Sequence, residues 1–172
     1  MKRYHYFVEG ECEKKLLKSF MYVDSDSFIE GKVEVFNFVN ERISLAKVRT
    51  IKKNTTVVIV TDTDVKNIDV LDSNIKTINR IALSSNIDII ILFSIEKFED
   101  EIVYSCDNIN NINELFKTQS ISDFKKKFIK HENIYSRLND AGFDIKKIWT
   151  RNATYPFDAY SSYKAGIIKK KH

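Results

Sequence analysis

Four short runs of β-branched and aromatic residues alternate, in the first half of the chain, with segments of helical periodicity. These runs predict strands over residues 4–8, 32–38, 55–61 and 87–93. The last two are almost continuously apolar, which is typical of strands buried on both faces of a parallel sheet. The intervening segments predict helices over residues 11–20, 39–51 and 69–83. The alternation indicates βαβ crossovers and therefore an α/β fold with an open, mainly parallel four-stranded sheet flanked by helices.

The pattern changes after the fourth run, where strong β signals stop. Apolar residues then recur at helical spacing, which predicts helices over residues 98–106, 112–116, 122–130 and 134–139. We therefore expect an α/β core over residues 1–110. For residues 111–172 we expect a helical, basic and aromatic extension packed on that core.

The net charge of +4 over 172 residues conceals an uneven distribution. Residues 114–172 hold 13 Lys and Arg against 6 Asp and Glu, whereas residues 1–113 hold 15 against 18. The basic, aromatic half is compatible with a polyanionic partner such as nucleic acid. The candidate contacts to phosphate are Lys126, Lys130, Lys147 and Arg151. A lysine run is more often a solvated helix face, and this alternative stays open for each cluster.

Cysteine content and hydropathy indicate the compartment. The two cysteines, Cys12 and Cys106, have no metal-ligand spacing and cannot form a disulfide framework. No signal peptide opens the chain, and no apolar run is long enough to cross a bilayer. We therefore expect a cytoplasmic protein that does not enter a membrane.

Acidic residues follow three of the four predicted strands. Glu9 ends the first strand, Asp62 and Asp64 end the third, and Glu96 follows the fourth. Because ligands of open α/β sheets bind at the carboxyl ends of the strands, these acids are expected at one edge. An isolated Asp-x-Asp is equally well explained by turn chemistry. Several like charges in one cleft, however, require a cation or a substrate to neutralise them.

Glu13 is a second unusual position. It shares a helical face with Leu16 and Leu17, so its carboxylate points to the core side of the first helix. A salt bridge to lysine or a favourable position near the helix N-terminus would explain it. Alternatively, Glu13 joins Glu9 as a ligand of a hard cation such as Mg²⁺, which prefers oxygen ligands.

The motifs Glu9-Gly10-x-x-Glu13 and Asp62-x-Asp64, each following a strand, together resemble the Toprim domain of topoisomerases and primases. Ser94-x-Glu96 is also similar to an element of OLD-type Toprim nucleases. The motifs are closest to those of small OLD-family and RloB-like nucleases. The resemblance covers roughly residues 3–105.

This resemblance implies a Mg²⁺- or Mn²⁺-dependent nuclease that cuts DNA or RNA, with anti-phage defence as its setting. Two cations can stabilise both the attacking and the leaving oxygens of the displacement. By resemblance the metal ligands would be Glu9, Glu13, Asp62 and Asp64, with Glu96 at a second metal. The catalytic residues would be Glu9, Glu13 and a lysine, for which Lys97 and Lys164 are both candidates.

The acids that open the helix over residues 98–106 divide into two groups. RloB-like proteins carry a similar Phe-Glu element here, which implies that Glu99 faces the site. For Asp100 and Glu101 we expect a solvated acidic helix start, which the helix dipole favours. His5 and His131 are isolated and do not support a zinc site.

Partners follow from the same resemblance. Nucleic acid is the expected substrate, and a homo-oligomer is compatible with the sequence. The chain has no Gly-x-x-x-x-Gly-Lys-Ser/Thr loop, so any ATPase would be a separate subunit. The alternative function is a non-catalytic subunit of Toprim fold that binds nucleic acid or a partner. A receiver-type phosphoacceptor is a third hypothesis, against which the Glu9-Gly10 strand end argues.

Overall fold

A computed structural model describes residues 2–23 and 28–163. Four parallel strands form one open sheet in the order β2-β1-β3-β4. The strands are β1 (Arg3–Val8), β2 (Lys32–Val35), β3 (Thr55–Asp62) and β4 (Ile87–Ser94). The predicted α/β class with an open parallel sheet is therefore confirmed.

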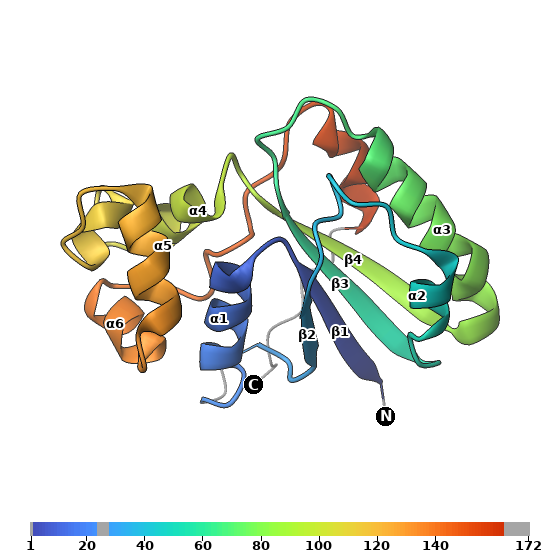
Figure 1. Cartoon of the computed structure of the whole chain (residues 1–172), viewed down its shortest axis with the longest axis horizontal. Coiled ribbons are helices and arrows are strands. Elements are labelled where there is room, and N and C mark those ends of the chain that lie inside the picture. Colours follow the sequence, from blue (N-terminus) through green and yellow to red (C-terminus); the bar gives the residue numbers. More distant parts are fainter. Residues whose placement is uncertain (1, 24–27, 164–172) are drawn as a thin grey trace.

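Helices cover both faces of the sheet (Figure 1). One face carries α1 (Glu11–Phe20), α4 (Phe98–Ser105), η1 (Ile112–Leu115), α5 (Ile121–Lys130) and α6 (Ile134–Asp140). The other face carries α2 (Leu45–Arg49), α3 (Asp69–Ser85) and η2 (Phe157–Tyr163). The two layers enclose two separate apolar clusters.

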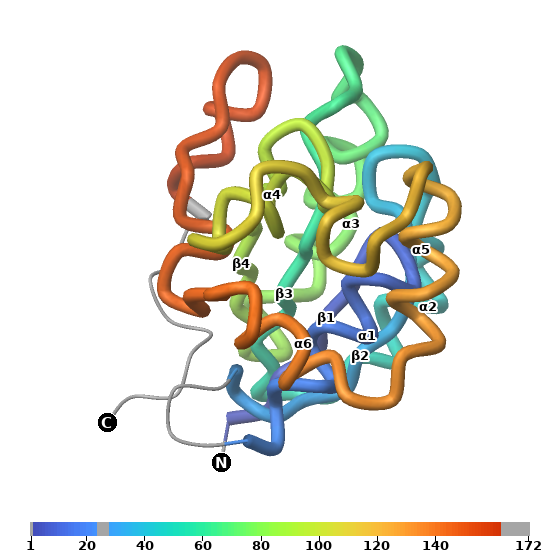
Figure 2. The backbone as a smooth tube through the Cα atoms, turned by 90° about the vertical axis from the view of Figure 1, so that its left-hand side faces the viewer, coloured from blue at the N-terminus to red at the C-terminus, as the bar shows by residue number. Residues whose placement is uncertain are grey.

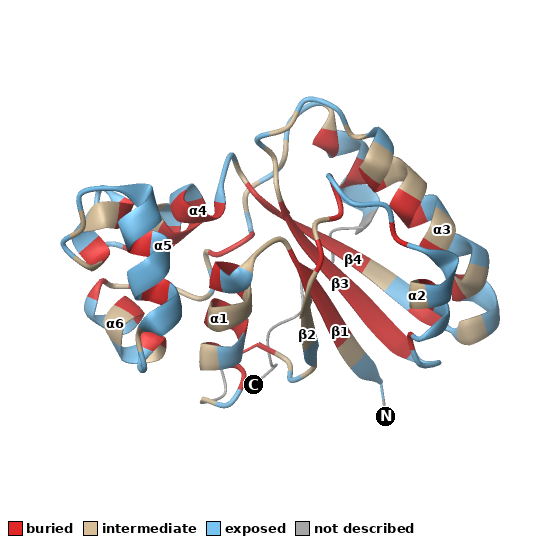
Figure 3. Cartoon of the chain, in the orientation of Figure 1, coloured by how far each residue is buried: buried red, intermediate tan, exposed pale blue. Residues whose placement is uncertain are grey.

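The alternation of side chains along each strand assigns residues to the two clusters. Tyr6 and Val8 face α1, whereas Phe7 faces the α2–α3 side. Phe124 and Leu138, from the helical extension, belong to the same cluster as Tyr6. The extension therefore shares a core with the sheet. Figure 3 shows this burial along the strands and on the inner sides of the helices.

The second strand and the helix after it are shorter than predicted. The strand ends at Val35, and the helix covers only Leu45–Arg49. Asn37 is the reason for the early stop, because its Oδ1 accepts hydrogen bonds from the backbone N–H groups of Val39 (3.1 Å) and Asn40 (3.0 Å). A side chain that captures nearby backbone donors competes with both strand and helix.

Asn74 on α3 fixes the rest of that loop. Its Oδ1 accepts a hydrogen bond from the Ile43 N–H at 2.8 Å. Its Nδ2 donates to the carbonyl oxygens of Phe38 (2.9 Å) and Glu41 (2.7 Å). Asn37 and Asn74 together bond backbone groups of the loop that would otherwise need helical hydrogen bonds.

Other boundaries differ less. The segment predicted as a helix over residues 112–116 is the short 3₁₀ helix η1.

Within the described ranges, no helix is both long and apolar enough to cross a membrane.

Candidate functional site

The carboxyl ends of the strands bring Glu9 and Asp62 together. Glu9 follows β1, and its Oε2 accepts hydrogen bonds from the Asp62 backbone N–H and the Thr61 hydroxyl, both at 3.0 Å. Its Oε1 accepts from the Asn37 Nδ2 at 2.8 Å. Three donors from two neighbouring segments thus hold this carboxylate in one orientation. Sequence reasoning missed Asn37 and Thr61, although both are polar residues at or just past a strand end.

Asp62 is the last residue of β3 and the register partner of Ser94 at the end of β4. Burial, followed by the charges of Glu9 and Glu13, raises the pKa of Asp62 to about 8. The Ser94 hydroxyl and the Phe98 amide act in the opposite direction, because each can donate to the charged form. Among the described residues, the buried Oδ1 of Asp62 has no hydrogen-bond partner.

Glu13 is only 5% exposed. Burial first, and then the charges of Glu9 and Glu99, raise its pKa to about 7. A Cβ at Gly10, the N-cap of α1, would lie 3.1 Å from Oε2 of Glu13. The glycine leaves the space that the Glu13 carboxylate occupies. We call Glu9, Glu13 and Asp62 the acidic centre.

Glu99 borders the acidic centre from the first turn of α4. It is 4% exposed, and its Oε1 lies 3.0 Å from the Nζ of Lys125 on α5. Lys125 also lowers the pKa of Glu13. The ammonium group of Lys125, from the helical extension, therefore lies beside Glu99 of α4 and near Glu13 of α1, which the lysine pattern of α5 alone does not indicate.

The expectation of a solvated Glu101 is wrong, because this side chain is fully buried. Its Oε1 accepts a hydrogen bond from the Trp149 N–H at 2.6 Å, and its Oε2 lies 2.6 Å from Nη2 of Arg151. Arg151, a predicted phosphate contact, thus has an internal carboxylate as its ion-pair partner. Asp100 is exposed, as expected.

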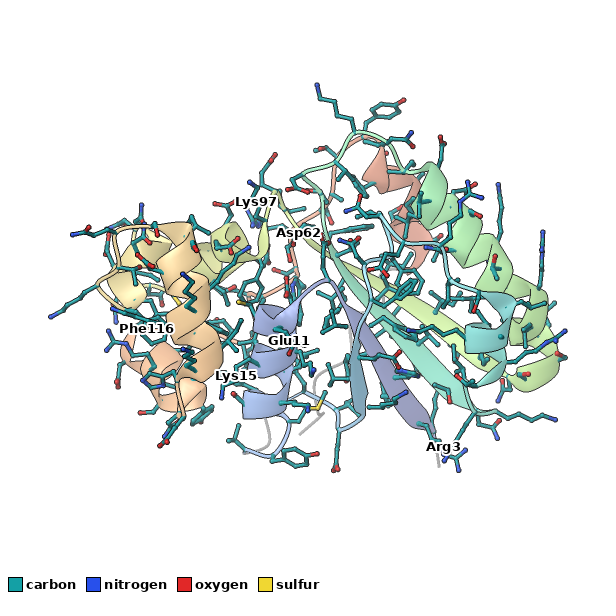
Figure 4. The ribbon with its side chains drawn as sticks, in the orientation of Figure 1. Arg3, Glu11, Lys15, Asp62, Lys97 and Phe116 are labelled. Atoms are coloured by element: carbon teal, nitrogen blue, oxygen red, sulfur yellow. The ribbon has the colours of Figure 1, made fainter. Side chains whose placement is uncertain are left out.

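The remaining predicted residues lie on exposed loops around the acidic centre. Asp64, Glu96 and Lys97 are all exposed. Lys97 immediately precedes Phe98, whose amide faces Asp62, and Figure 4 shows Lys97 on the loop above α1 with Asp62 at the strand end. The loops after β3 and β4 are joined where the Glu96 N–H donates to the Thr63 hydroxyl at 2.8 Å. Lys164 lies outside the described residues.

The acidic centre has the donor chemistry of a divalent-cation site. Within the part of the chain that the structure describes, no three His, Cys, Asp or Glu side chains are placed so that they could hold a metal ion. The carboxylate donors are nevertheless oxygen ligands, and Asp62 presents a buried oxygen that no donor within residues 2–23 and 28–163 satisfies. The raised pKa values of Glu13 and Asp62 reflect burial first and neighbouring negative charge second, and a cation would relieve the second of these.

The basic candidates divide into two groups. Lys126 and Lys130 line a concave surface between η1 and α5, together with Lys117 and Lys127. Lys147 instead lies 2.5 Å from Oδ1 of Asp107. We call the first set the lysine groove: Lys117, Lys126, Lys127 and Lys130.

Comparison of the chain with protein-family models, curated proteins and solved structures gave no match. Its function is therefore inferred from the site.

Proposed function

We propose that this chain is a Mg²⁺- or Mn²⁺-dependent nuclease of Toprim type that hydrolyses phosphodiester bonds of DNA or RNA at the acidic centre. The observation that carries the proposal is the Oδ1 of Asp62, buried without a hydrogen-bond partner among the described residues, beside Glu9 and Glu13. A carboxylate oxygen in this position is suited to binding a cation. An uncharged molecule bound there would not compensate the negative charge of the three carboxyl groups.

Few protein ligands are needed for such a cation. Mg²⁺ usually keeps several waters and binds through one or two carboxylates plus the phosphates of the substrate. Asp62 with Glu9 would meet this requirement. The proposed additional ligands are Glu13, in the acidic centre, and Asp64 and Glu96, on the exposed loops. The bound cation would neutralise phosphate charge and make its water more acidic.

The side chains of the acidic centre have different roles in this proposal. Three hydrogen bonds hold the Glu9 carboxylate in one orientation, so it is suited to positioning the cation. Glu13, whose pKa is about 7, is suited to accepting and returning a proton near neutral pH. Lys97 and Lys164 remain the proposed catalytic lysines, and the lysine groove would contact the phosphate backbone.

The setting of the activity is part of the proposal. The resemblance to OLD-family and RloB-like nucleases supports anti-phage defence with a separate ATPase subunit. The buried, free thiols of Cys12 and Cys106 support a reducing compartment, the cytoplasm.

A cleavage assay tests the proposal directly. Supercoiled plasmid and structured RNA are incubated with the protein in Mn²⁺, Mg²⁺ or EDTA. We expect metal-dependent cutting that Asp62→Ala and Glu9→Ala abolish, and that Asp100→Ala, at an exposed acid of α4, retains. Equal cutting by the Asp62 and Glu9 variants would show that the acidic centre is not the active site. Nucleic-acid binding without cutting under any condition would favour the non-catalytic alternative.

A further inference from the structure

Trp149 links the helical extension to the acidic centre. It is the single tryptophan of the chain and is 3% exposed. Its indole Nε1–H donates a hydrogen bond to the Ser94 Oγ at 3.3 Å, across 55 positions of sequence. Figure 2 shows the C-terminal part of the chain, in orange and red, running beside α4 and β4.

A buried carboxylate fixes Trp149 in place. Its backbone has a φ of +57°, in the left-handed region that non-glycine residues seldom adopt. The Trp149 N–H donates to Oε1 of Glu101 at 2.6 Å, while Arg151 and the Ile95 N–H (3.3 Å) share Oε2. A conformation of this kind persists only where its surroundings determine it, and here Glu101 does so.

Ser94 lies between Trp149 and Asp62 in this chain of contacts. The Ser94 side chain is fully buried and pairs in register with Asp62 across β3 and β4. Because the Ser94 oxygen accepts from the indole, its single hydrogen is directed to another acceptor. The register places the Asp62 carboxyl beside this hydroxyl, and donation from Ser94 lowers the pKa of Asp62. Such a bond would engage one oxygen of Asp62, whereas the other, Oδ1, has no partner among the described residues.

We propose that Trp149 is a positioning residue of the acidic centre. The chain of contacts from Glu101 through Trp149 and Ser94 orients Asp62 so that Oδ1 is available as a ligand. The part of this inference that concerns the cation rests on the proposed function. The contact chain itself does not, and the two are tested separately.

The contact chain is tested by NMR of the whole ¹⁵N-labelled protein without metal. A single tryptophan gives a single indole ¹H–¹⁵N peak. We expect Ser94→Ala and Asp62→Asn each to shift this peak, the second through the Ser94 hydroxyl. Asp64→Asn, which changes an exposed acid two residues further along, should leave the peak in place. An indole peak unchanged by Asp62→Asn would overturn the inference.

The effect on the cation is tested by removing only the indole donor. Trp149 is replaced biosynthetically by 3-benzothienylalanine, which keeps the bicyclic shape but has sulfur in place of N–H. By calorimetry we expect about tenfold weaker Mn²⁺ binding, the lower end of what outer-shell partners contribute, and an unchanged unfolding midpoint. Unchanged Mn²⁺ affinity, with affinity lost in Asp62→Asn, would remove the positioning role and leave the metal site intact. If the unaltered protein binds no Mn²⁺, the proposed function fails, and the NMR result alone decides the contact chain.

Discussion

At the scale of single residues, glycine is required at positions 10 and 31 for two different reasons. A Cβ at Gly10 would lie 3.1 Å from the Glu13 carboxylate, whereas a Cβ at Gly31 would lie 2.6 Å from the backbone oxygen of Tyr4. Gly10 has an extended backbone (φ −148°, ψ −179°) that any residue adopts. The first glycine therefore makes room within the acidic centre, and the second makes room within the fold.

We predict that Gly10→Ala weakens Mn²⁺ binding on the order of tenfold, because it displaces the carboxylate of Glu13. Its free energy of unfolding should change by less than about 1 kcal/mol. Gly31→Ala is the matched control and should destabilise the fold by about 1–3 kcal/mol, because the backbone of Tyr4 must move. Calorimetry and urea unfolding measure the two effects. A Gly10→Ala variant that loses stability but keeps its Mn²⁺ affinity would contradict this assignment.

The acidic centre also predicts how stability depends on pH without metal. The pKa of Asp62 is raised to about 8 and that of Glu13 to about 7, so the folded state holds protons that the unfolded chain releases near pH 4. Their contribution is therefore fully present below about pH 4 and is lost as the pH rises toward 7 and 8. Asp62→Asn cannot ionise, so it should gain stability relative to the parent protein as the pH increases from about 4 to 8.

Urea unfolding in EDTA across this pH range measures the difference, with Asp64→Asn as the exposed control. Saturating Mn²⁺ should remove the penalty in the parent protein and leave Asp62→Asn unaffected. Parallel pH profiles for the parent and Asp62→Asn would mean that Asp62 is not in the environment described.

At the scale of elements, apolar patterning predicts some boundaries closely and others poorly. The strand over Thr55–Asp62 and the helix over Asp69–Ser85 lie within two residues of their predicted ends, because burial determines both. The segment between β2 and α2 was predicted wrongly. Its conformation depends on the side chains of Asn37 and Asn74, and the second of these is remote in sequence. Local periodicity contains no information about such a partner.

The ion pair between α4 and α5 allows a prediction at this scale. Lys125→Ala leaves the buried Glu99 carboxylate without its cation, which should cost about 1–3 kcal/mol of unfolding free energy. This loss of stability is smaller than for a fully buried ion pair, because the Lys125 side chain is about half exposed to solvent. Lys126→Ala, one position further on the same helix, should change stability by less than about 0.5 kcal/mol.

Urea unfolding gives both values. Adding Glu99→Gln to Lys125→Ala should recover part of the lost unfolding free energy, because the unpaired charge of the Glu99 carboxylate is then removed. If the two lysine variants are equally stable, Lys125 is only a solvated lysine of α5.

At the scale of the whole molecule, the sequence predicted the strand-end acids but not the groups that reach them from the extension. Glu9 and Asp62 meet because parallel strands end at one edge, a consequence of topology that the chain order reveals. Lys125 contacts Glu99, and Trp149 contacts Ser94, only through packing of the extension, which no spacing in the sequence encodes. These two contacts therefore cross the predicted division at residue 110.

The charge asymmetry of the whole chain leads to a prediction about nucleic-acid binding. Lys126 and Lys130 lie in the lysine groove, whereas Lys147 is already paired with Asp107. Each phosphate contact contributes about 0.7–0.9 to the slope of log affinity against log salt concentration. Combining Lys126→Ala with Lys130→Ala should therefore lower that slope by about 1.4–1.8. Lys147→Ala, whose ammonium already has a carboxylate partner, should change the slope less.

Fluorescence anisotropy over a range of salt concentrations measures the slopes, with Asp62→Asn in every variant so that no substrate is cut. Circular dichroism controls for folding, which removal of exposed lysines should leave intact. A double variant that binds with the parent slope would place the backbone contacts elsewhere. Equal slope losses in the double variant and in Lys147→Ala would indicate attraction by net charge alone, with no defined path for the phosphates. A larger loss in the double variant would identify the lysine groove as the surface along which nucleic acid lies.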